Sequence, residues 1–319
     1  LPAAVAIGGL GVAGLDAGPD VRGCRIALAL DRFRQEFAAD RPDVVLVQGA
    51  TDTAVAGALA ADAQGIPLVR VEAGVRSHEL DRPAEHNRVL LDRAADVLCA
   101  STPVDVGNLE AEGLGGQDVR LTGSTAVEAV RHRLMGERER LAVLRAWGLE
   151  PDRYVVATLG RPEHTDDEEA LFAVLNQLAG VVDAGHPVVV SVDPRAKAAV
   201  RRLSPGMGLR VVDRVWHSEF LALAKHAGLL VSDSGAVHEE ATVLKRPVLV
   251  VRSTERPEVL GDFGTLVGPH DDLAGIALDW LADGADRRAA LADVPSPFGD
   301  GRSGRRIASA VRAVVRSAA

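Results

Sequence analysis

The sequence predicts an α/β protein built from two Rossmann-like domains. Short apolar runs of strand length alternate with amphipathic helical segments, which is the pattern of βαβ units in a parallel sheet. The alternation is interrupted near residue 150 and then starts again. A chain of 319 residues is long enough for two domains with separate cores. We therefore expect domains over residues 1–150 and 151–301, followed by a C-terminal helix over 302–319.

The elements of the first domain follow from the spacing of apolar residues. Ile26, Leu30, Phe33 and Phe37 recur at helical spacing, so an amphipathic helix is expected there. The continuous apolar run Val44–Val47 is typical of a buried parallel strand. The remaining elements expected are a helix near 53–63 and strands at 66–71, 97–99 and 119–121, with helices between them.

The second domain repeats this alternation. An Arg- and Glu-rich helix at 134–149 leads into it. The expected strands are 154–158, 187–192, 229–232 and 248–251, and the expected helices are 168–182, 220–227, 238–244 and 273–281, with a final helix at 305–315. Two similar halves with a cleft between them provide a natural place for a nucleotide ligand.

Composition limits the classes of partner. The net charge of −9 is spread along the chain, and no basic stripe is present to neutralise the phosphates of a nucleic acid. A nucleotide remains compatible, because backbone amides can hold phosphate in an acidic protein. No apolar stretch approaches the roughly eighteen residues of a membrane span, and no signal peptide is evident. Cys24 and Cys99 are expected to be buried thiols, and the protein is expected to be cytoplasmic.

Several motifs occur in a characteristic order. VSDSGAVHEE spans 231–240, and KRPVLV at 245–250 and TERPE at 254–258 follow it. Upstream stand RPDVVLVQG, VEAGVR, EHNR and LTGST, and SPFGDG lies near the C-terminus at 296–301. This series resembles the non-hydrolysing UDP-N-acetylglucosamine 2-epimerases over nearly the whole chain from about Ile26.

The resemblance implies the glycosyltransferase-B architecture, in which two parallel-sheet domains face each other across a cleft and the C-terminal helix packs back on the first. It also implies a UDP-sugar substrate and no metal or redox cofactor. UDP is eliminated across C1 and C2 of the sugar to leave a glycal, and is then added back with C2 inverted, which interconverts UDP-N-acetylglucosamine (UDP-GlcNAc) and UDP-N-acetylmannosamine (UDP-ManNAc). A homodimer is the family expectation.

The substrate-binding candidates lie mainly in the second domain. Ser234 and Gly235 stand between a strand and a helix expected to begin near His238, where free N–H groups can bind a diphosphate, although a simple tight turn has the same sequence. By resemblance, Glu240 takes the two ribose hydroxyls. Arg256 either faces a phosphate or pairs with the adjacent Glu255. Arg88 and Arg161, both in family-like motifs, complete this set.

The catalytic candidates are carboxylates of the first domain. Glu72 follows an expected strand and is flanked by Ala73 and Gly74, so its carboxylate is expected to point into the cleft. Glu85 and Arg88 are three residues apart and share one helix face. Either carboxylate could move the C2 proton or protonate the departing oxygen if burial raises its pKa. The alternative for Glu85 is a structural ion pair with Arg88.

The chain departs from the family at three places. Ala50 stands where the family has an aspartate, and Gln48 where it has a histidine. Gly160 stands where the family has a catalytic histidine. The family's opening strand and its GTRPE motif have no counterpart in this sequence, whose residues 1–23 resemble the region that follows them.

Two neighbouring side chains are candidates to compensate. Asp52 lies two residues after Ala50, but such a shift at a helix start turns the side chain by about 200°. His164 lies four residues after Gly160 and is either a replacement proton carrier or a surface histidine. Because the family's proton carriers are lost, a UDP-sugar-dependent glycosyltransferase and a non-catalytic UDP-sugar binder are alternatives to the epimerase.

Overall fold

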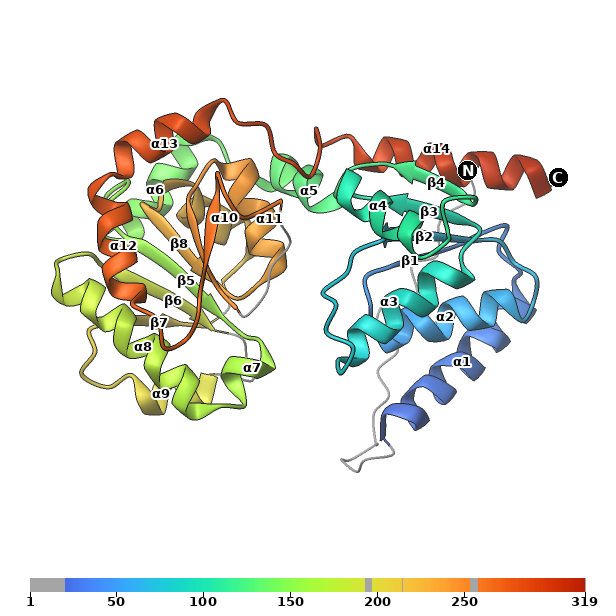
Figure 1. The fold of residues 1–319 in the computed structure, drawn as a ribbon, viewed down its shortest axis with the longest axis horizontal. Helices are drawn as coiled ribbons and strands as arrows, with labels where there is room; N and C mark the ends of the chain where they lie inside the picture. Colours follow the sequence, from blue (N-terminus) through green and yellow to red (C-terminus); the bar gives the residue numbers. More distant parts are fainter. Residues whose placement is uncertain (1–20, 193–196, 214, 253–257, 319) are drawn as a thin grey trace. The chain divides into compact units, whose positions relative to one another are not determined.

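The computed structural model describes residues 21–192, 197–213, 215–252 and 258–318. It divides into two compact units. One holds the described chain up to Ser124 together with the segment from Arg302 onward, and the other holds Thr125–Gly301. Each unit contains one fully parallel sheet, so the expected α/β class with two parallel sheets is confirmed (Figure 1).

The first unit is built on a four-stranded sheet in the order β1-β2-β3-β4. Its strands are β1 (Val45–Gln48), β2 (Leu68–Ala73), β3 (Val97–Ala100) and β4 (Asp118–Leu121). The helices that alternate with them are α1 (Val21–Ala39), α2 (Asp52–Asp62), α3 (Pro83–Ala94) and α4 (Pro103–Ala111), and α14 (Ser303–Ala318) joins them from the C-terminal end.

Two apolar layers cover this sheet. On one face, residues of α2, α3 and α4 pack against inward side chains of the strands, with Leu91, Leu98 and Leu109 fully buried. On the other face, Ile307 and Ala310 of α14 pack against β2 and β3, and Figure 1 shows this helix lying along the strands. Burial on both faces explains why β3, all four residues of which are buried, is a continuous apolar run.

The second unit contains a six-stranded sheet in the order β10-β9-β8-β5-β6-β7. Its strands are β5 (Val155–Leu159), β6 (Val188–Val192), β7 (Arg210–Val212), β8 (Leu229–Ser232), β9 (Val248–Val251) and β10 (Gly264–Val267). Renumbered within the unit, this is the 3-2-1-4-5-6 order of the doubly wound fold. Strand order therefore reverses between β5 and β8, which is where such folds bind ligands.

Helices cover both faces of this sheet. One face packs against α8 (Glu168–Asp183), α9 (Lys197–Leu203) and α12 (Leu273–Ala282). The opposite face packs against α5 (Thr125–Arg133), α6 (Glu137–Trp147), α10 (His217–His226) and α11 (Gly235–Leu244). The short helix α7 (Pro162–Thr165) follows β5, and α13 (Gly284–Ala292) follows α12.

The division between the units differs from the expected boundary near residue 150. Val127 and Val130 of α5 and Leu144 of α6 are buried in the core of the second unit, so the chain leaves the first unit after Ser124. The helix expected at 134–149 is in fact α6, with α5 as a separate helix before it.

The sequence reasoning also missed β7 and β10, which have only three and four residues. Cys99 is buried as expected, but the expectation for Cys24 is wrong, because it is exposed on α1. Among the helices of the described residues, none combines the length and the apolar character needed to cross a membrane.

Candidate functional site

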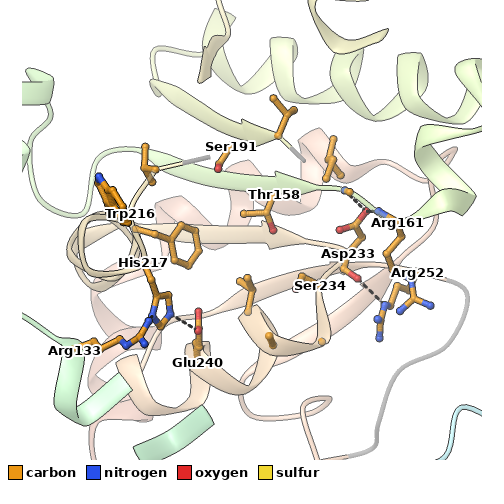
Figure 2. Close-up of a pocket in the computed structure, with 18 residues that line it drawn as sticks. Arg133, Thr158, Arg161, Ser191, Trp216, His217, Asp233, Ser234, Glu240 and Arg252 are labelled. Carbon is orange, nitrogen blue, oxygen red and sulfur yellow. Dashed lines mark hydrogen bonds and ion pairs between the residues drawn. The ribbon is translucent and has the colours of Figure 1, made fainter. Parts of the chain in front are cut away.

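A pocket of about 960 Å³ lies in the second unit at the reversal of strand order. Its wall is formed by the carboxyl ends of β5, β6 and β8, the start of α10 and the first turns of α11. This volume is in the range of pockets that hold small ligands. Polar residues that line it are Arg133, Thr158, Arg161, Ser191, His217, Asp233, Ser234, Glu240 and Arg252 (Figure 2).

Ser234 and Gly235 both line this pocket, at the start of α11. The helix begins at Gly235, three residues before the expected start at His238, so Ser234 is its N-cap. The first backbone bond of the helix runs from the N–H of His238 to the carbonyl of Ser234, over 3.0 Å. The N–H groups of the first helical turn have no acceptor within the helix. They form the positive end of the helix dipole, so they are suited to bind an anion.

Asp233 organises the loop after β5. Its Oδ2 accepts hydrogen bonds from the backbone N–H groups of Gly160 and Arg161, both at 2.9 Å. His164 Nδ1 lies 3.1 Å from the same oxygen. The side chains of His164 and Asp233 are only 3% and 2% exposed, and His164 is not among the residues that line the pocket. In the structure, His164 therefore contacts Asp233 from outside the pocket and helps to hold its carboxylate in place. It is not the exposed imidazole that a proton carrier requires.

Glu240 lies in α11, one turn beyond the anion-binding start of the helix. It lines the pocket, although its side chain is only 9% exposed. Its Oε1 lies 2.7 Å from Nε2 of His217, the first residue of α10. A buried carboxylate that retains one oxygen toward a pocket is able to accept hydroxyl hydrogen bonds from a ligand.

Three guanidinium groups line the pocket and give it positive charge, those of Arg133, Arg161 and Arg252. Arg252 follows β9 and its Nε donates to the backbone carbonyl of Asp233 over 2.8 Å. In Figure 2, Arg161 and Arg252 gather beside Asp233, whereas His217, Glu240 and Arg133 lie at the opposite end of the pocket. Arg256, which the sequence motif singled out, lies outside the described residues.

Glu72 of the first unit has an unusual backbone conformation. It lies inside β2 and not after it, at a point where the pairing with β3 shifts register between Val71 and Ala73. Its φ angle is +65°, which residues with a side chain seldom adopt. Its Oε1 accepts a hydrogen bond of 2.7 Å from Nε2 of Gln48, which ends β1. Strain of this kind concentrates at functional sites.

A buried ionic network fixes the segment around Glu72. Asp92 of α3 is fully buried and lies 3.2 Å from Arg70 Nε and 2.8 Å from Arg76 Nη1. It also accepts the backbone N–H of Gly74 over 3.0 Å. Gly74 has a φ of +78°, and a Cβ there would lie 2.1 Å from the carbonyl oxygen of Asp105, so only glycine fits. The conformation of Glu72 is therefore supported on its C-terminal side by packing and charge.

Glu85 and Arg88 form the structural pair that was the alternative interpretation of these residues. Arg88 Nη1 lies 2.6 Å from Glu85 Oε2, and the backbone N–H groups of Ser77 and His78 also donate to the carboxylate. Burial favours the neutral acid, but these hydrogen bonds outweigh it and lower the pKa of Glu85. The idea that burial raises this pKa for proton transfer is therefore wrong.

Asp52 also belongs to a local network. Its Oδ1 accepts from Arg22 Nε over 2.9 Å and from Asn87 Nδ2 over 3.0 Å, and Asn87 also donates to the carbonyl of Ala50. Burial opposes ionisation, but Arg22 and Asn87 together lower the pKa of Asp52. The structure gives Asp52 the role of tying α1, α2 and α3 together, and not that of replacing the aspartate missing at Ala50.

Most of the residues that line the pocket were not singled out from the sequence, and among them are Arg133, Trp216, His217, Asp233 and Arg252. Asp233 and Arg252 directly follow buried strands, so a rule that searches strand ends could have found them. No such signal marks His217, whose partner is 23 residues away. Across the part of the chain that the structure describes, no group of three or more His, Cys, Asp or Glu residues is placed to hold a metal ion.

The fold and the pocket define an α/β protein with a pocket lined by a helix N-terminus and three arginines at the switch point of a doubly wound sheet. Residues 14–312 match the family model described as UDP-N-acetylglucosamine 2-epimerase. The chain therefore belongs to the UDP-N-acetylglucosamine 2-epimerase family, a family of isomerases.

Individual relatives agree with this assignment. The UDP-N-acetylglucosamine 2-epimerase of Methanocaldococcus jannaschii is 32% identical, over 92% of this chain and 81% of that relative. The UDP-2,3-diacetamido-2,3-dideoxy-D-glucuronate 2-epimerase of Pseudomonas aeruginosa is 30% identical, over 84% and 74% respectively. A crystal structure of the M. jannaschii enzyme in complex with UDP-GlcNAc and UDP superposes with a TM-score of 0.77 at 31% identity, covering 93% of this chain and 82% of that one.

Proposed function

We propose that this protein binds a UDP-sugar and interconverts UDP-GlcNAc and UDP-ManNAc, or a closely related pair, by elimination and re-addition of UDP. The observation that carries the proposal is the arrangement of Glu240 one turn beyond the start of α11, inside a pocket at the switch point of the second sheet. That arrangement offers an anion site and a hydroxyl acceptor on one helix, both lining one pocket, and a nucleoside diphosphate carries groups for both.

The diphosphate is assigned to the start of α11. Ser234 and Gly235 supply the helix N-terminus, and Arg161 and Arg252 line the same end of the pocket. Charge-assisted hydrogen bonds from guanidinium groups to phosphate oxygens are among the strongest in proteins, and they add to the helix dipole.

The nucleoside is assigned to the opposite end of the pocket. Glu240 accepts the two ribose hydroxyls there, and Trp216, which lies near His217 in Figure 2, also lines the pocket. Trp216 is 85% exposed, which is unusual for a tryptophan and leaves one face of the ring open to stack on a base.

Removal of the proton at C2 of the sugar is assigned to Glu72. In the elimination, a carboxylate takes the C2 proton, the C1–O bond breaks, and UDP leaves with the electron pair as a C1=C2 double bond forms. In the return step, a UDP oxygen attacks C1, and C2 takes a proton from solvent water on its other face, while Glu72 releases to solvent the proton that it took. A carboxylate that extends from a strained backbone position and is oriented by a hydrogen bond from Gln48 is suited to such a transfer. Glu85 and Arg88 support the neighbouring loop, whose Ser77 and His78 they hold.

A second candidate is a UDP-sugar-binding protein without epimerase activity. The observation that favours it is the loss of two proton carriers, because Ala50 and Gly160 have no titratable side chain and neither Asp52 nor His164 replaces them in the described geometry. The pocket residues that bind UDP would serve such a protein equally well.

Proton NMR of UDP-GlcNAc incubated with the protein separates the candidates. An epimerase produces the anomeric signal of UDP-ManNAc from UDP-GlcNAc alone. A UDP-sugar-dependent transferase produces neither UDP-ManNAc nor free UDP until an acceptor is added. A binder broadens the substrate signals but leaves the substrate unchanged, and that result would reject the proposed activity.

We also propose that the protein acts in the cytoplasm as a homodimer, which the family resemblance supports. Light scattering coupled to size-exclusion chromatography tests the assembly. A mass of 33.4 kDa, that of one chain, would contradict the dimer.

A further inference from the structure

His217 and Glu240 form a close polar contact within the pocket wall. His217 Nε2 lies 2.7 Å from Glu240 Oε1, and the two side chains are 31% and 9% exposed (Figure 2). The pair joins the first residue of α10 to the second turn of α11. Both residues line the pocket, so the contact lies where the ligand would bind.

Arg133, which lies on the other side of the His217 imidazole, indicates which ring nitrogen carries the proton. Arg133 Nη1 lies 3.5 Å from Nδ1 of His217. A guanidinium group can only donate, so Nδ1 is the acceptor and the ring proton is on Nε2. His217 therefore donates its Nε2–H to Glu240, whose carboxylate can only accept. Because both ring nitrogens have protein partners, the ring has no N–H left for a ligand.

This donation fixes the orientation of the Glu240 carboxylate. A glutamate side chain has three rotatable bonds, and ordering it when a ligand binds costs conformational entropy. His217 holds Oε1 in place before binding. Glu240 Oε2 makes no hydrogen bond within the described ranges, so it is the oxygen that a ligand hydroxyl would meet.

We propose that His217 is a positioning residue that holds Glu240 for the two ribose hydroxyls and thereby makes the pocket select ribonucleotides over 2′-deoxyribonucleotides. The proposal rests on the proposed function, in which Glu240 takes these hydroxyls. A carboxylate that is fixed in direction cannot compensate when the 2′-hydroxyl is absent, so the 2′-deoxyribonucleotide binds more weakly. A mobile carboxylate can turn toward the remaining hydroxyl and recover part of that affinity.

The test is calorimetric titration of the full chain with UDP and with 2′-deoxy-UDP. His217→Phe keeps a ring but removes the donor, and His217→Gln returns an N–H near the position of Nε2. The matched control is His132→Gln on α5, because His132 Nε2 also faces a glutamate, Glu128 at 3.9 Å, but neither residue lines the pocket. Thermal melts establish that each variant is folded.

The expected result is that the parent binds UDP at least about tenfold more tightly than 2′-deoxy-UDP, the lower range for a hydrogen bond to a charged group. In His217→Phe this ratio should fall to within about twofold, mainly through weaker UDP binding, and His217→Gln should restore much of it. The His132→Gln control should match the parent.

The remaining outcomes distinguish failure of the positioning role of His217 from failure of the proposed function. A parent that discriminates and a His217→Phe variant that discriminates equally would overturn the positioning role and leave the UDP site standing. Equal affinity of the parent for both nucleotides would remove the ribose contact of Glu240, and the positioning role with it. No binding of either nucleotide to the parent would overturn the proposed function itself.

Discussion

Gln48 donates a hydrogen bond from Nε2 to Oε1 of Glu72 over 2.7 Å, and so joins the ends of two adjacent parallel strands. Glu72 has a φ of +65° at a shift in strand register, and Gln48 is the side chain seen to hold its carboxylate. Gln48 stands where the family resemblance expects a histidine. In this chain an amide, which neither gains nor loses a proton, orients the carboxylate assigned to C2.

Replacing Gln48 by alanine should therefore slow the reaction without weakening the binding of UDP. We expect kcat to fall by roughly tenfold, the effect of losing about one kilocalorie or slightly more of hydrogen bonding. The Kd for UDP should stay within about twofold, since the assigned UDP-binding residues lie in the other unit. Gln64→Ala, which removes an amide that donates to backbone carbonyls of the first unit, is the control. Equal losses of rate in the two variants would indicate a general loss of stability.

Replacing Glu240 by alanine should weaken UDP binding by about 1.5–3 kcal/mol, the range for hydrogen bonds to a charged group. Calorimetric titration measures the change. Glu239→Ala is the matched control, since Glu239 is adjacent on α11 but does not line the pocket. Unchanged affinity in a folded Glu240→Ala variant would remove this residue from the ligand site.

UDP should quench tryptophan fluorescence through Trp216. The chain has three tryptophans, and Trp216 is the one that lines the pocket. Stacking of a base on an exposed indole changes its emission and contributes about 1–3 kcal/mol in comparable base–aromatic contacts. Trp216→Phe should abolish most of the quenching and bind UDP with little loss, because phenylalanine keeps an aromatic face. Quenching of the same size in that variant would place the base elsewhere.

His164→Asn should act on binding and stability, and not on proton transfer. His164 is buried against Asp233, which holds the N–H groups of Gly160 and Arg161. Loss of the contact between His164 and Asp233 should raise the KM for UDP-GlcNAc several-fold. The shape of the pH profile of kcat between pH 5 and pH 9 should stay the same. A flattened acidic limb of that profile would show that the imidazole carries a proton after all.

The hydrogen bonds to Glu85 should make stability depend on pH. Burial favours the neutral acid, but Arg88, Ser77 and His78 outweigh it and lower the pKa of this carboxyl below its ordinary value of 4.5 in the folded protein. The stabilisation is therefore fully present above the pKa of the unfolded chain and is lost as pH falls through the lower folded pKa. Urea unfolding at pH 7 and at decreasing pH below 4.5 measures it. The free energy of unfolding of Glu85→Gln should fall less steeply with acid than that of the parent, and equal slopes would contradict the account.

The fold could be predicted largely from local pattern. Buried parallel strands such as Val248–Val251 read as continuous apolar runs, and their limits were predicted correctly. Short elements such as β7, with three residues at the sheet edge, carry too little apolar signal. The boundary was misplaced because the burial of Val127 and Val130 depends on contacts with distant helices.

The candidate site divides in the same way. Ser234, Gly235 and Glu240 could be found because a strand, a short loop and a helix start are contiguous in sequence. The states of Glu85, Asp52 and His164 could not, since each depends on donors or acceptors brought to it by other segments, such as Arg22 for Asp52 and Asp233 for His164. A residue type shows what a group is able to do, but its partners decide whether it is available.

Isotope exchange shows whether Glu72 moves the proton at C2 of a UDP-sugar. UDP-GlcNAc is incubated with the protein in heavy water, and deuterium at C2 is followed by NMR. The parent should incorporate deuterium at C2, whereas Glu72→Gln should bind UDP normally and incorporate none. A parent that binds UDP-GlcNAc without exchange would contradict the epimerase chemistry, and a Glu72→Gln variant that exchanges at the parent's rate would contradict the role of Glu72.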